Sequence, residues 1–338
     1  MMSGKFELVF LTFFLITNLF IFFNFDFLKD KIKIFDKPDN ILKKHKKKTS
    51  LLGGTILIFN FLLFFFLSFF LEKNLIDLGN KEINSFLLLA ISFFLIGLYD
   101  DKYKIDPNFK LSLILIATIL IMLIYPDFSL RMIKISFLEK NYFFNNFSIP
   151  FTVLSFALLV NALNMFDGID LQLTTYSIFI FIVLILKDVF LTFSIIMLMC
   201  LIFICILNFK KKLFLGDNGA FLLSGIIGFI FVNQYNNDPL FFSSDEIFLL
   251  LMVPGIDMLR LFTMRIINKK NPFKGDLNHM HHLLKKKYKN IIKTNFVLSL
   301  FYLIPFLCLI AGFKTYLILC IYCIIYISFL KIISKTSK

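Results

Sequence analysis

The sequence contains no tryptophan, few cysteines and little charge for its length. Of its 338 residues, 17% are charged, five are cysteine and four are histidine. All five cysteines fall in apolar stretches without other metal-ligating residues beside them, which argues against a disulfide framework and against a cysteine metal site. They are Cys200, Cys205, Cys308, Cys320 and Cys323. Because no internal repeat, long linker or polar domain interrupts the chain, residues 1–338 are expected to form one integral domain.

Apolar residues make up 59% of the chain and come in continuous runs. A helix needs about 20 apolar residues to cross a bilayer, so these runs predict an all-α, polytopic transmembrane helix bundle of about 10–11 helices. Transmembrane β-barrels are excluded, because their strands alternate apolar and polar residues. The expected spans are 4–24, 51–71, 83–99, 111–125, 149–165, 174–186, 188–208, 219–235, 246–267, 295–312 and 315–333.

The net charge of +14 would suit a nucleic-acid partner, but the positions of the basic residues indicate a membrane instead. If the chain crosses at each span, 27 of the 36 Lys and Arg residues fall in loops on one side. By the positive-inside rule this side is cytoplasmic, so the N-terminus is expected in the periplasm and the C-terminus in the cytoplasm. The first apolar stretch has no small-residue cleavage site and is interpreted as a retained helix.

Four loops on the predicted cytoplasmic side contain nearly all of the unusual polar residues. The first contains Asp100 and Asp101, where a helix leaves the membrane. Adjacent carboxylates at this boundary repel each other, and they become favourable when a divalent cation or a phosphate proton lies between them and a substrate. The alternative interpretation is an ordinary solvated helix end.

The second cluster places Asn161, Asn164, Asp167 and Asp170 on neighbouring positions of one helix face. Amides can bind a nucleotide base or hydroxyl groups, and carboxylates can bind a metal or a ribose. The alternative is a set of polar contacts between membrane helices.

The third cluster, from Gly216 to Gly219, follows three lysines and opens an apolar helix. Asp217 can hold a cation or cap that helix, and the glycines let a phosphate approach the free backbone N–H groups. The fourth cluster contains His279, His281 and His282. Histidine clusters bind transition metals or contact phosphates. Since no cysteine lies within reach as a further zinc ligand, contact with a phosphate or nucleotide is favoured.

Taken together and in this order, the clusters resemble the polyprenyl-phosphate N-acetylhexosamine-1-phosphate transferases of glycosyltransferase family 4, relatives of the phospho-MurNAc-pentapeptide translocase. The resemblance covers almost the whole chain, and the His-x-His-His form is similar to the branch that uses UDP-N-acetylglucosamine or related sugars. The matching positions are Asp36-Lys37-Pro38, Lys44-His45, Gly53-Gly54, Asp100-Asp101, Asn161 to Asp170, Gly216-Asp217, Asp257, Arg265, Pro272-Phe273, Asp276 and His279-Met280-His281-His282.

This resemblance implies an enzyme of a bacterial inner membrane with its active site on the cytoplasmic face. It would transfer a HexNAc-1-phosphate, most simply GlcNAc-1-phosphate, from a UDP-sugar to undecaprenyl or another polyprenyl phosphate. UMP would leave, and the polyprenyl-diphosphate sugar would initiate a cell-envelope glycan. The resemblance also implies Mg²⁺ as cofactor, with Mn²⁺ as an alternative, and it is compatible with a homodimer.

The resemblance also implies roles for individual residues. The expected metal ligands are Asp217 and Asn164. The expected catalytic residues are Asp100, Asp101, Asp217 and His281, with the first two holding metal or taking the proton of the lipid phosphate. The expected substrate contacts are Asn161, Asp167 and Asp170 for the nucleotide sugar, Arg265, His279 and His282 for the diphosphate or sugar, and Lys44 and His45 for a phosphate.

Several positions depart from the family pattern near the expected sugar and nucleotide contacts. Leu171 stands where a glycine commonly follows the Asp-Gly-x-Asp motif, Ala220 replaces a serine and Leu277 replaces an arginine. Thr174 and Thr175 replace small residues, and Ser50 replaces a proline. These departures bear on which sugar is used.

The main alternative is a multi-spanning transporter with an anion site on its cytoplasmic face. A transporter is expected to place its polar groups near the bilayer midplane in broken or repeated helices, whereas here they gather at one boundary. The CDP-alcohol phosphatidyltransferases are disfavoured because their longer Asp motif is missing. Within the ninth span, Asp257 and Arg260 are spaced to pair on one helix face. The outer segment 126–148 is amphipathic and is expected at the membrane interface.

Overall fold

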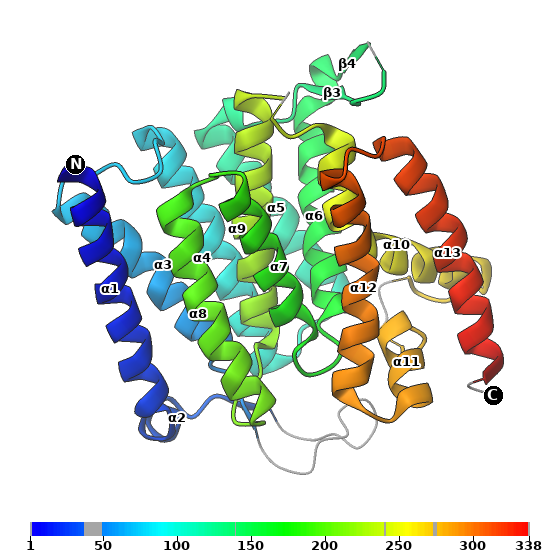
Figure 1. Cartoon of the computed structure of the whole chain (residues 1–338), viewed down its shortest axis with the longest axis horizontal. Coiled ribbons are helices and arrows are strands. Elements are labelled where there is room, and N and C mark those ends of the chain that lie inside the picture. Colours follow the sequence, from blue (N-terminus) through cyan, green and yellow to red (C-terminus); the bar gives the residue numbers. More distant parts are fainter. Residues whose placement is uncertain (1, 37–48, 139, 240, 273–275, 337–338) are drawn as a thin grey trace. The chain divides into compact units, whose positions relative to one another are not determined.

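The computed structural model describes residues 2–36, 49–138, 140–239, 241–272 and 276–336 (Figure 1). In this part of the chain the structure is mainly helical, with two short pairs of strands. The helices are α1 (Met2–Phe23), α2 (Phe25–Ile32), α3 (Gly53–Phe70), α4 (Asn80–Tyr103), α5 (Pro107–Ile124), α6 (Ser148–Phe166), α7 (Gln172–Leu186), α8 (Leu191–Phe209), α9 (Gly216–Asn237), α10 (Ser244–Ile267), α11 (Met280–Tyr288), α12 (Ile291–Ile310) and α13 (Thr315–Thr336).

Each of the predicted spans corresponds to one helix, with ends shifted by a few residues. Among the described residues, ten helices are long and apolar enough to cross a membrane, and the shorter apolar helix Gln172–Leu186 is the eleventh match. The prediction of a multi-pass helical membrane protein is confirmed. The direction in which the termini face stays a prediction.

The chain divides into two compact units, which are described separately. Unit 1 comprises residues 1–106 and 173–226, and unit 2 comprises residues 107–172 and 227–338. Helix α9 contributes its first half to unit 1 and its second half to unit 2. The single-domain interpretation of the sequence stays a prediction.

The core of unit 1 is built from phenylalanines, which the apolar runs supply in quantity. Phe61 of α3 lies with its ring centroid 5.1 Å from that of Phe86 of α4 and 5.9 Å from that of Phe193 of α8. Both pairs meet edge to face at 81°, the arrangement that ring quadrupoles favour. Nearby, Asn18 of α1 and Asn60 of α3 exchange amide hydrogen bonds, which satisfy two polar groups inside apolar helices.

The residues that precede α3 tie it to the start of α9. Strands β1 (Phe35–Asp36) and β2 (Thr49–Ser50) pair antiparallel, and Ser50 also bridges to Leu213. The backbone N–H groups of Gly53 and Gly54 then donate to the carbonyls of Phe214 and Leu215. The N-terminus of α9 is therefore held against α3 by backbone hydrogen bonds within unit 1.

In unit 2, α10 packs against α6 and α12, and α11 packs against α12 and α13. The segment 126–148 forms short 3-10 turns, η1 (Pro126–Phe128) and η2 (Asn145–Phe147), around a hairpin of strands β3 (Met132–Lys134) and β4 (Asn141–Phe143). This hairpin and α11 lie at opposite ends of the unit 2 helices (Figure 1).

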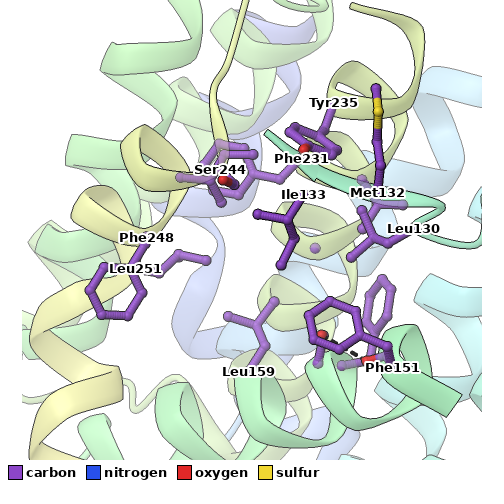
Figure 2. Close-up of a pocket in the computed structure, with 15 residues that line it drawn as sticks. Leu130, Met132, Ile133, Phe151, Leu159, Phe231, Tyr235, Ser244, Phe248 and Leu251 are labelled. Atoms are coloured by element: carbon purple, nitrogen blue, oxygen red, sulfur yellow. Dashed lines mark hydrogen bonds between the residues drawn. The ribbon is translucent and has the colours of Figure 1, made fainter. Parts of the chain in front are cut away.

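An apolar cavity of about 270 Å³ lies at the hairpin end of unit 2, between β3 and the ends of α6, α9 and α10 (Figure 2). Its few polar lining groups are already bonded within the protein. Ser155 Oγ donates to the Phe151 carbonyl, Ser244 Oγ donates to the Lys134 carbonyl, and the Tyr235 hydroxyl accepts from the Lys134 N–H. A lining of hydrocarbon side chains suits an apolar group and not a phosphate, so this cavity is not the candidate site.

Candidate functional site

In unit 1, two of the predicted polar clusters meet at the start of α9. The Asp101 carboxylate, at the end of α4, accepts hydrogen bonds from the backbone N–H groups of Asp217 and Asn218, each at 3.0 Å. These N–H groups belong to the first turn of α9, which has no intrahelical acceptor for them. Asp101 therefore caps α9 from another helix, and the positive end of the helix dipole stabilises its charge.

The backbone packing around this cap depends on Gly97. An ideal Cβ built on Gly97 would lie 2.4 Å from the Asp217 carbonyl oxygen and 2.6 Å from the Asn218 Cα. Any larger residue would push α4 away from α9 and separate Asp101 from the N–H groups that it accepts. Asp100 is buried beside this contact, and its Oδ1 accepts from the Ile105 N–H at 3.1 Å. Asp100, Asp101 and Asp217 thus all belong to unit 1, where the Asp101 carboxylate contacts the backbone of Asp217.

In unit 2, the second cluster lies at the end of α6 and in the loop that follows. The Asn161 amide donates to the Ala157 carbonyl one turn earlier, at 2.7 Å. Asp167 ends the helix, and its N–H bonds to the carbonyls of Leu163 and Asn164. The Asp170 carbonyl accepts from the Asn295 amide of α12 at 2.9 Å. The backbone of the loop is therefore bonded to α12, and the Asp170 carboxylate takes no part in this hydrogen bond.

Leu171, one of the departures from the family pattern, has a left-handed backbone with φ of 73°. This conformation favours glycine, because a Cβ crowds the neighbouring carbonyl. The common glycine at this position of the family thus has a backbone explanation, and the leucine here is strained.

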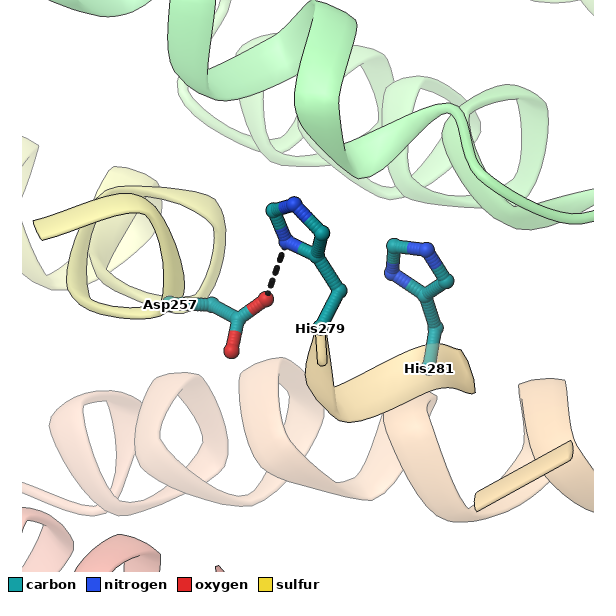
Figure 3. Close-up of side chains that lie close together, drawn as sticks. All are labelled: Asp257, His279 and His281. Atoms are coloured by element: carbon teal, nitrogen blue, oxygen red, sulfur yellow. Dashed lines mark hydrogen bonds and ion pairs between the residues drawn. The ribbon is translucent and has the colours of Figure 1, made fainter. Parts of the chain in front are cut away.

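The fourth cluster is organised by Asp257, which is 4% exposed and lies inside α10 (Figure 3). Its Oδ2 lies 2.9 Å from His279 Nδ1, and its Oδ1 accepts from Arg260 Nη2 at 2.8 Å. The Met280 N–H at the start of α11 also donates to this carboxylate. The predicted pair of Asp257 and Arg260 is confirmed, and it belongs to a larger network that also fixes the histidine helix.

Arg265, near the end of α10, fixes the loop that leads to the histidines. Its Nε donates to Asp276 Oδ2 at 2.8 Å and its Nη1 donates to the Pro272 carbonyl at 2.6 Å. Among the described residues, its Nη2 is buried without a hydrogen-bond partner. Burial alone would raise the pKa of Asp276, but the hydrogen bonds from Arg265 and the Asn278 N–H hold it below its ordinary value. Asp276 therefore stays ionised and holds the guanidinium in place.

His281 is 1% exposed, and neither of its ring nitrogens has a hydrogen-bond partner among the described residues. Its ring stacks on that of His279, with centroids 5.2 Å apart and an interplanar angle of 11°. An ideal Cβ on Gly168 would lie only 1.9 Å from His281 Nε2. The loop after α6 therefore closes the Nε2 edge of the His281 ring.

His281 and His282 are held in their neutral forms near pH 7. Burial lowers the pKa of His281 well below its ordinary value, and the neighbouring His282 and His279 lower it further. Burial, followed by the charge of His279, lowers the pKa of His282 to about 4. An anion bound beside these rings would favour their protonated forms and would offset this cost.

Asp257, His279 and His281 also form a group whose potential metal-ligand atoms lie within 4.8 Å of one another. Two nitrogens and one oxygen suit a transition metal, whereas Mg²⁺ prefers oxygen ligands. The Asp257 carboxylate, moreover, is already occupied by hydrogen-bond donors. Asp100, Asp101 and Asp217 offer the oxygen donors that Mg²⁺ prefers, but among the described residues only Asp257, His279 and His281 form such a group.

The predicted residues are divided between the two units. Asp100, Asp101 and Asp217 lie in unit 1, whereas the predicted residues of unit 2 are Asn161, Asn164, Asp167, Asp170, Arg265, His279, His281 and His282. The two predicted metal ligands, Asp217 and Asn164, thus belong to different units. Lys44 and His45 lie outside the described residues.

The sequence interpretation missed several partners. Asp101 was not recognised as the cap of α9, and Asp257 was not recognised as the partner of His279. Tyr326 of α13, whose hydroxyl donates to Asp257 Oδ1 at 2.9 Å, was not considered at all. A buried carboxylate inside an apolar span was the one signal that could have indicated further donors.

Comparisons with known proteins agree with the motifs. Residues 83–234 match the family model described as glycosyl transferase family 4. An undecaprenyl-phosphate alpha-N-acetylglucosaminyl 1-phosphate transferase of Thermotoga maritima is 28% identical over 257 residues, covering 76% of this chain and 75% of the relative. The protein of that name from Escherichia coli K12 is 25% identical over 284 residues, covering 81% of this chain and 74% of the relative. The match to the family model, the relatives and the ordered polar clusters together support the assignment of the chain to the polyprenyl-phosphate N-acetylhexosamine-1-phosphate transferases of glycosyl transferase family 4.

Proposed function

We propose that the protein transfers GlcNAc-1-phosphate from UDP-GlcNAc to undecaprenyl phosphate or a similar polyprenyl phosphate, and releases UMP. The relatives from Thermotoga maritima and Escherichia coli are named for such a transfer. In this chain, the observation that carries the proposal is a pair of buried polar groups without partners among the described residues, Arg265 Nη2 and His281 Nδ1. Buried polar groups are almost always hydrogen-bonded, and the phosphates of a UDP-sugar would supply the acceptors.

The residues of unit 1 suit the cation that such a reaction needs. We assign Mg²⁺ to Asp217, with Asp100 and Asp101 of the same unit as further candidate ligands. Asp101 accepts from two backbone N–H groups at the start of α9, which fixes its carboxylate beside the backbone of Asp217. Bound Mg²⁺ would neutralise charge that accumulates on the transferring phosphoryl group. Asp100 is the candidate acceptor for the proton of the lipid phosphate.

The residues of unit 2 suit recognition of the donor. Arg265 and the histidines would contact the diphosphate. Asn161, Asp167 and Asp170 would contact the uridine, the ribose or the sugar through their amide and carboxylate groups. The role of Asn164 as a second metal ligand remains part of the proposal.

The basic loops support a cytoplasmic location for this chemistry, in a bacterial inner membrane with the N-terminus outside. Phosphorylated donors and an anionic leaflet both favour that face. A transporter is not favoured, because the relatives are named as transferases. A homodimer stays a prediction.

The test is UMP release by the purified protein in detergent with UDP-GlcNAc, Mg²⁺ and undecaprenyl phosphate. We expect release that Asp217→Ala abolishes and that Asp30→Ala, a change of an exposed carboxylate in α2, leaves intact. A panel of UDP-N-acetylhexosamines in the same assay identifies the sugar. If the folded wild-type protein releases UMP from none of the donors, the proposed function is refuted. If Asp217→Ala still releases UMP, Asp217 has no part in the mechanism.

A further inference from the structure

The last helix of the chain, α13, carries none of the motifs, yet one of its side chains is bonded to the network around the histidines. The Tyr326 hydroxyl donates to Asp257 Oδ1 at 2.9 Å, and the other oxygen of the same carboxylate lies 2.9 Å from His279 Nδ1. Tyr326 is 2% exposed and His279 is 5% exposed. The three side chains therefore form a buried chain of hydrogen bonds from α13 through α10 to the start of α11.

The geometry fixes which nitrogen of His279 is available to a substrate. A carboxylate that accepts from Nδ1 holds the proton on that atom and turns Nε2 away from Asp257. Among the described residues, no hydrogen bond joins Nε2 of His279 to the protein. The orientation of the imidazole thus depends on the orientation of the Asp257 carboxylate.

That orientation depends in turn on the donors to Oδ1. Arg260 Nη2 and the Tyr326 hydroxyl both donate to Oδ1, and together they leave Oδ2 to face His279. Arg260 is on the same helix as Asp257 and moves with it, whereas Tyr326 approaches from a different helix. The Met280 N–H of α11 also donates to both oxygens, so Tyr326 is the side-chain donor to Oδ1 that comes from outside α10 and α11. Hydrogen bonds to a charged acceptor are among the strongest that a neutral hydroxyl makes.

We propose that Tyr326 is a positioning residue for the transfer reaction, acting through Asp257 to hold His279 with Nε2 directed at the phosphates of the donor. The proposal rests on the proposed function, because it assigns His279 to the diphosphate. It adds that α13 contributes to catalysis through Tyr326.

The chain supplies a matched control one turn away. Tyr322 lies on the same face of α13, is 4% exposed, and stacks on Tyr326 with ring centroids 6.1 Å apart. Among the described residues, its buried hydroxyl has no hydrogen-bond partner. Tyr322→Phe and Tyr326→Phe thus remove the same atom from the same helix, and only the second change removes a bond to Asp257.

The experiment measures kcat and the KM for UDP-GlcNAc in wild type, Tyr322→Phe, Tyr326→Phe, His279→Gln and the double variant Tyr326→Phe with His279→Gln. Tyr326→Phe is expected to lower kcat by roughly 3- to 10-fold, the effect of losing one hydrogen bond to a charged group at a distance from the substrate. KM should change less than kcat, because an interaction that strengthens in the transition state is lost. Tyr322→Phe should match wild type.

The double variant decides whether Tyr326 acts through His279. His279→Gln is expected to lower kcat by about 100-fold, and adding Tyr326→Phe should lower it no further. Equal kinetic effects of the two tyrosine variants, or a full additional loss in the His279→Gln background, would overturn the proposal. Should Tyr326→Phe fail to fold, Asp257→Asn replaces it and must show the same lack of additivity. An inactive wild-type protein would instead refute the proposed function, and this inference with it.

Discussion

Replacing Gly168 by alanine should displace His281 without straining the backbone of residue 168. An ideal Cβ on Gly168 would lie 1.9 Å from His281 Nε2, and 2.6 and 2.8 Å from the two adjacent ring carbons, whereas ordinary contacts are 3.4–4 Å. The methyl group and the ring thus cannot occupy their present places together. Among the described glycines, only Gly216 and Gly312 have positive φ. Glycine is therefore required at position 168 because a side chain there would collide with His281, and not because of its backbone conformation.

The cost follows from the burial of His281. The ring is 1% exposed and lies against His279 on its other side, so it cannot yield by a small rotation. Inserting one methyl group into such packing costs about 1–3 kcal/mol. In a chain of this size that corresponds to a melting temperature lower by about 2–6 °C. If His281 contacts the diphosphate, its displacement should also reduce UMP release by about 100-fold.

A double-variant cycle in detergent, with thermal unfolding and UMP release as measurements, tests this reasoning. Gly168→Ala should destabilise the wild-type protein, but it should change stability by less than about 0.5 kcal/mol in a His281→Ala background, where the ring is gone. Gly255→Ala is the control, because nothing lies within 4 Å of a Cβ built there. The same loss of stability in both backgrounds would refute the contact as its cause.

Three further predictions concern single features of the two units. Leu171→Gly should be more stable than Leu171→Ala by about 1 kcal/mol in thermal unfolding, because only the alanine keeps a Cβ at positive φ. Equal stabilities of the two variants would exclude backbone strain at residue 171. Below the ordinary histidine pKa of about 6.5, unfolded chains take up protons on residues 281 and 282, whereas in the folded chain burial lowers the pKa of His282 to about 4 and that of His281 well below 6.5. Stability should therefore be constant above pH 6.5, should fall on acidification towards pH 4, and should fall less in His282→Gln. Asp101→Ala should cost about 1–2 kcal/mol by uncapping α9, whereas Asp30→Ala should change unfolding little.

The membrane helices could be predicted from the sequence because their signal is local. A run of apolar residues specifies a span without reference to any other part of the chain, and the helix from Gly53 to Phe70 shows how closely the expected span 51–71 is reproduced. Helix α11 was not predicted, because it has only nine residues and contains the histidines and lysines of a polar loop. The hairpin of β3 and β4 was missed for a similar reason, since strands of three residues leave little periodicity to detect.

The polar residues of the candidate site were predicted by type and order, but their partners were not. Asp101 and Asp217 are separated by more than one hundred residues, and no local pattern indicates that one accepts from the backbone of the other. The same holds for Gly168 and His281, which the sequence places in separate clusters. The departure at Leu171 acquired a physical meaning only when its φ was known.

Asp257 shows how far a sequence argument about partners can be taken. A carboxylate inside a membrane span is costly unless it is paired, so its presence predicts donors nearby. Arg260, three residues along the same helix, satisfies one lone pair, but a carboxylate has about four. Further donors were therefore required, and they had to come from outside α10. Their identity could not be read from the sequence, because α13 offers several aromatic hydroxyl groups in an otherwise ordinary apolar run. Packing alone selects Tyr326 over Tyr322, and for that reason the comparison of these two tyrosines tests both the structure and the function assigned to it.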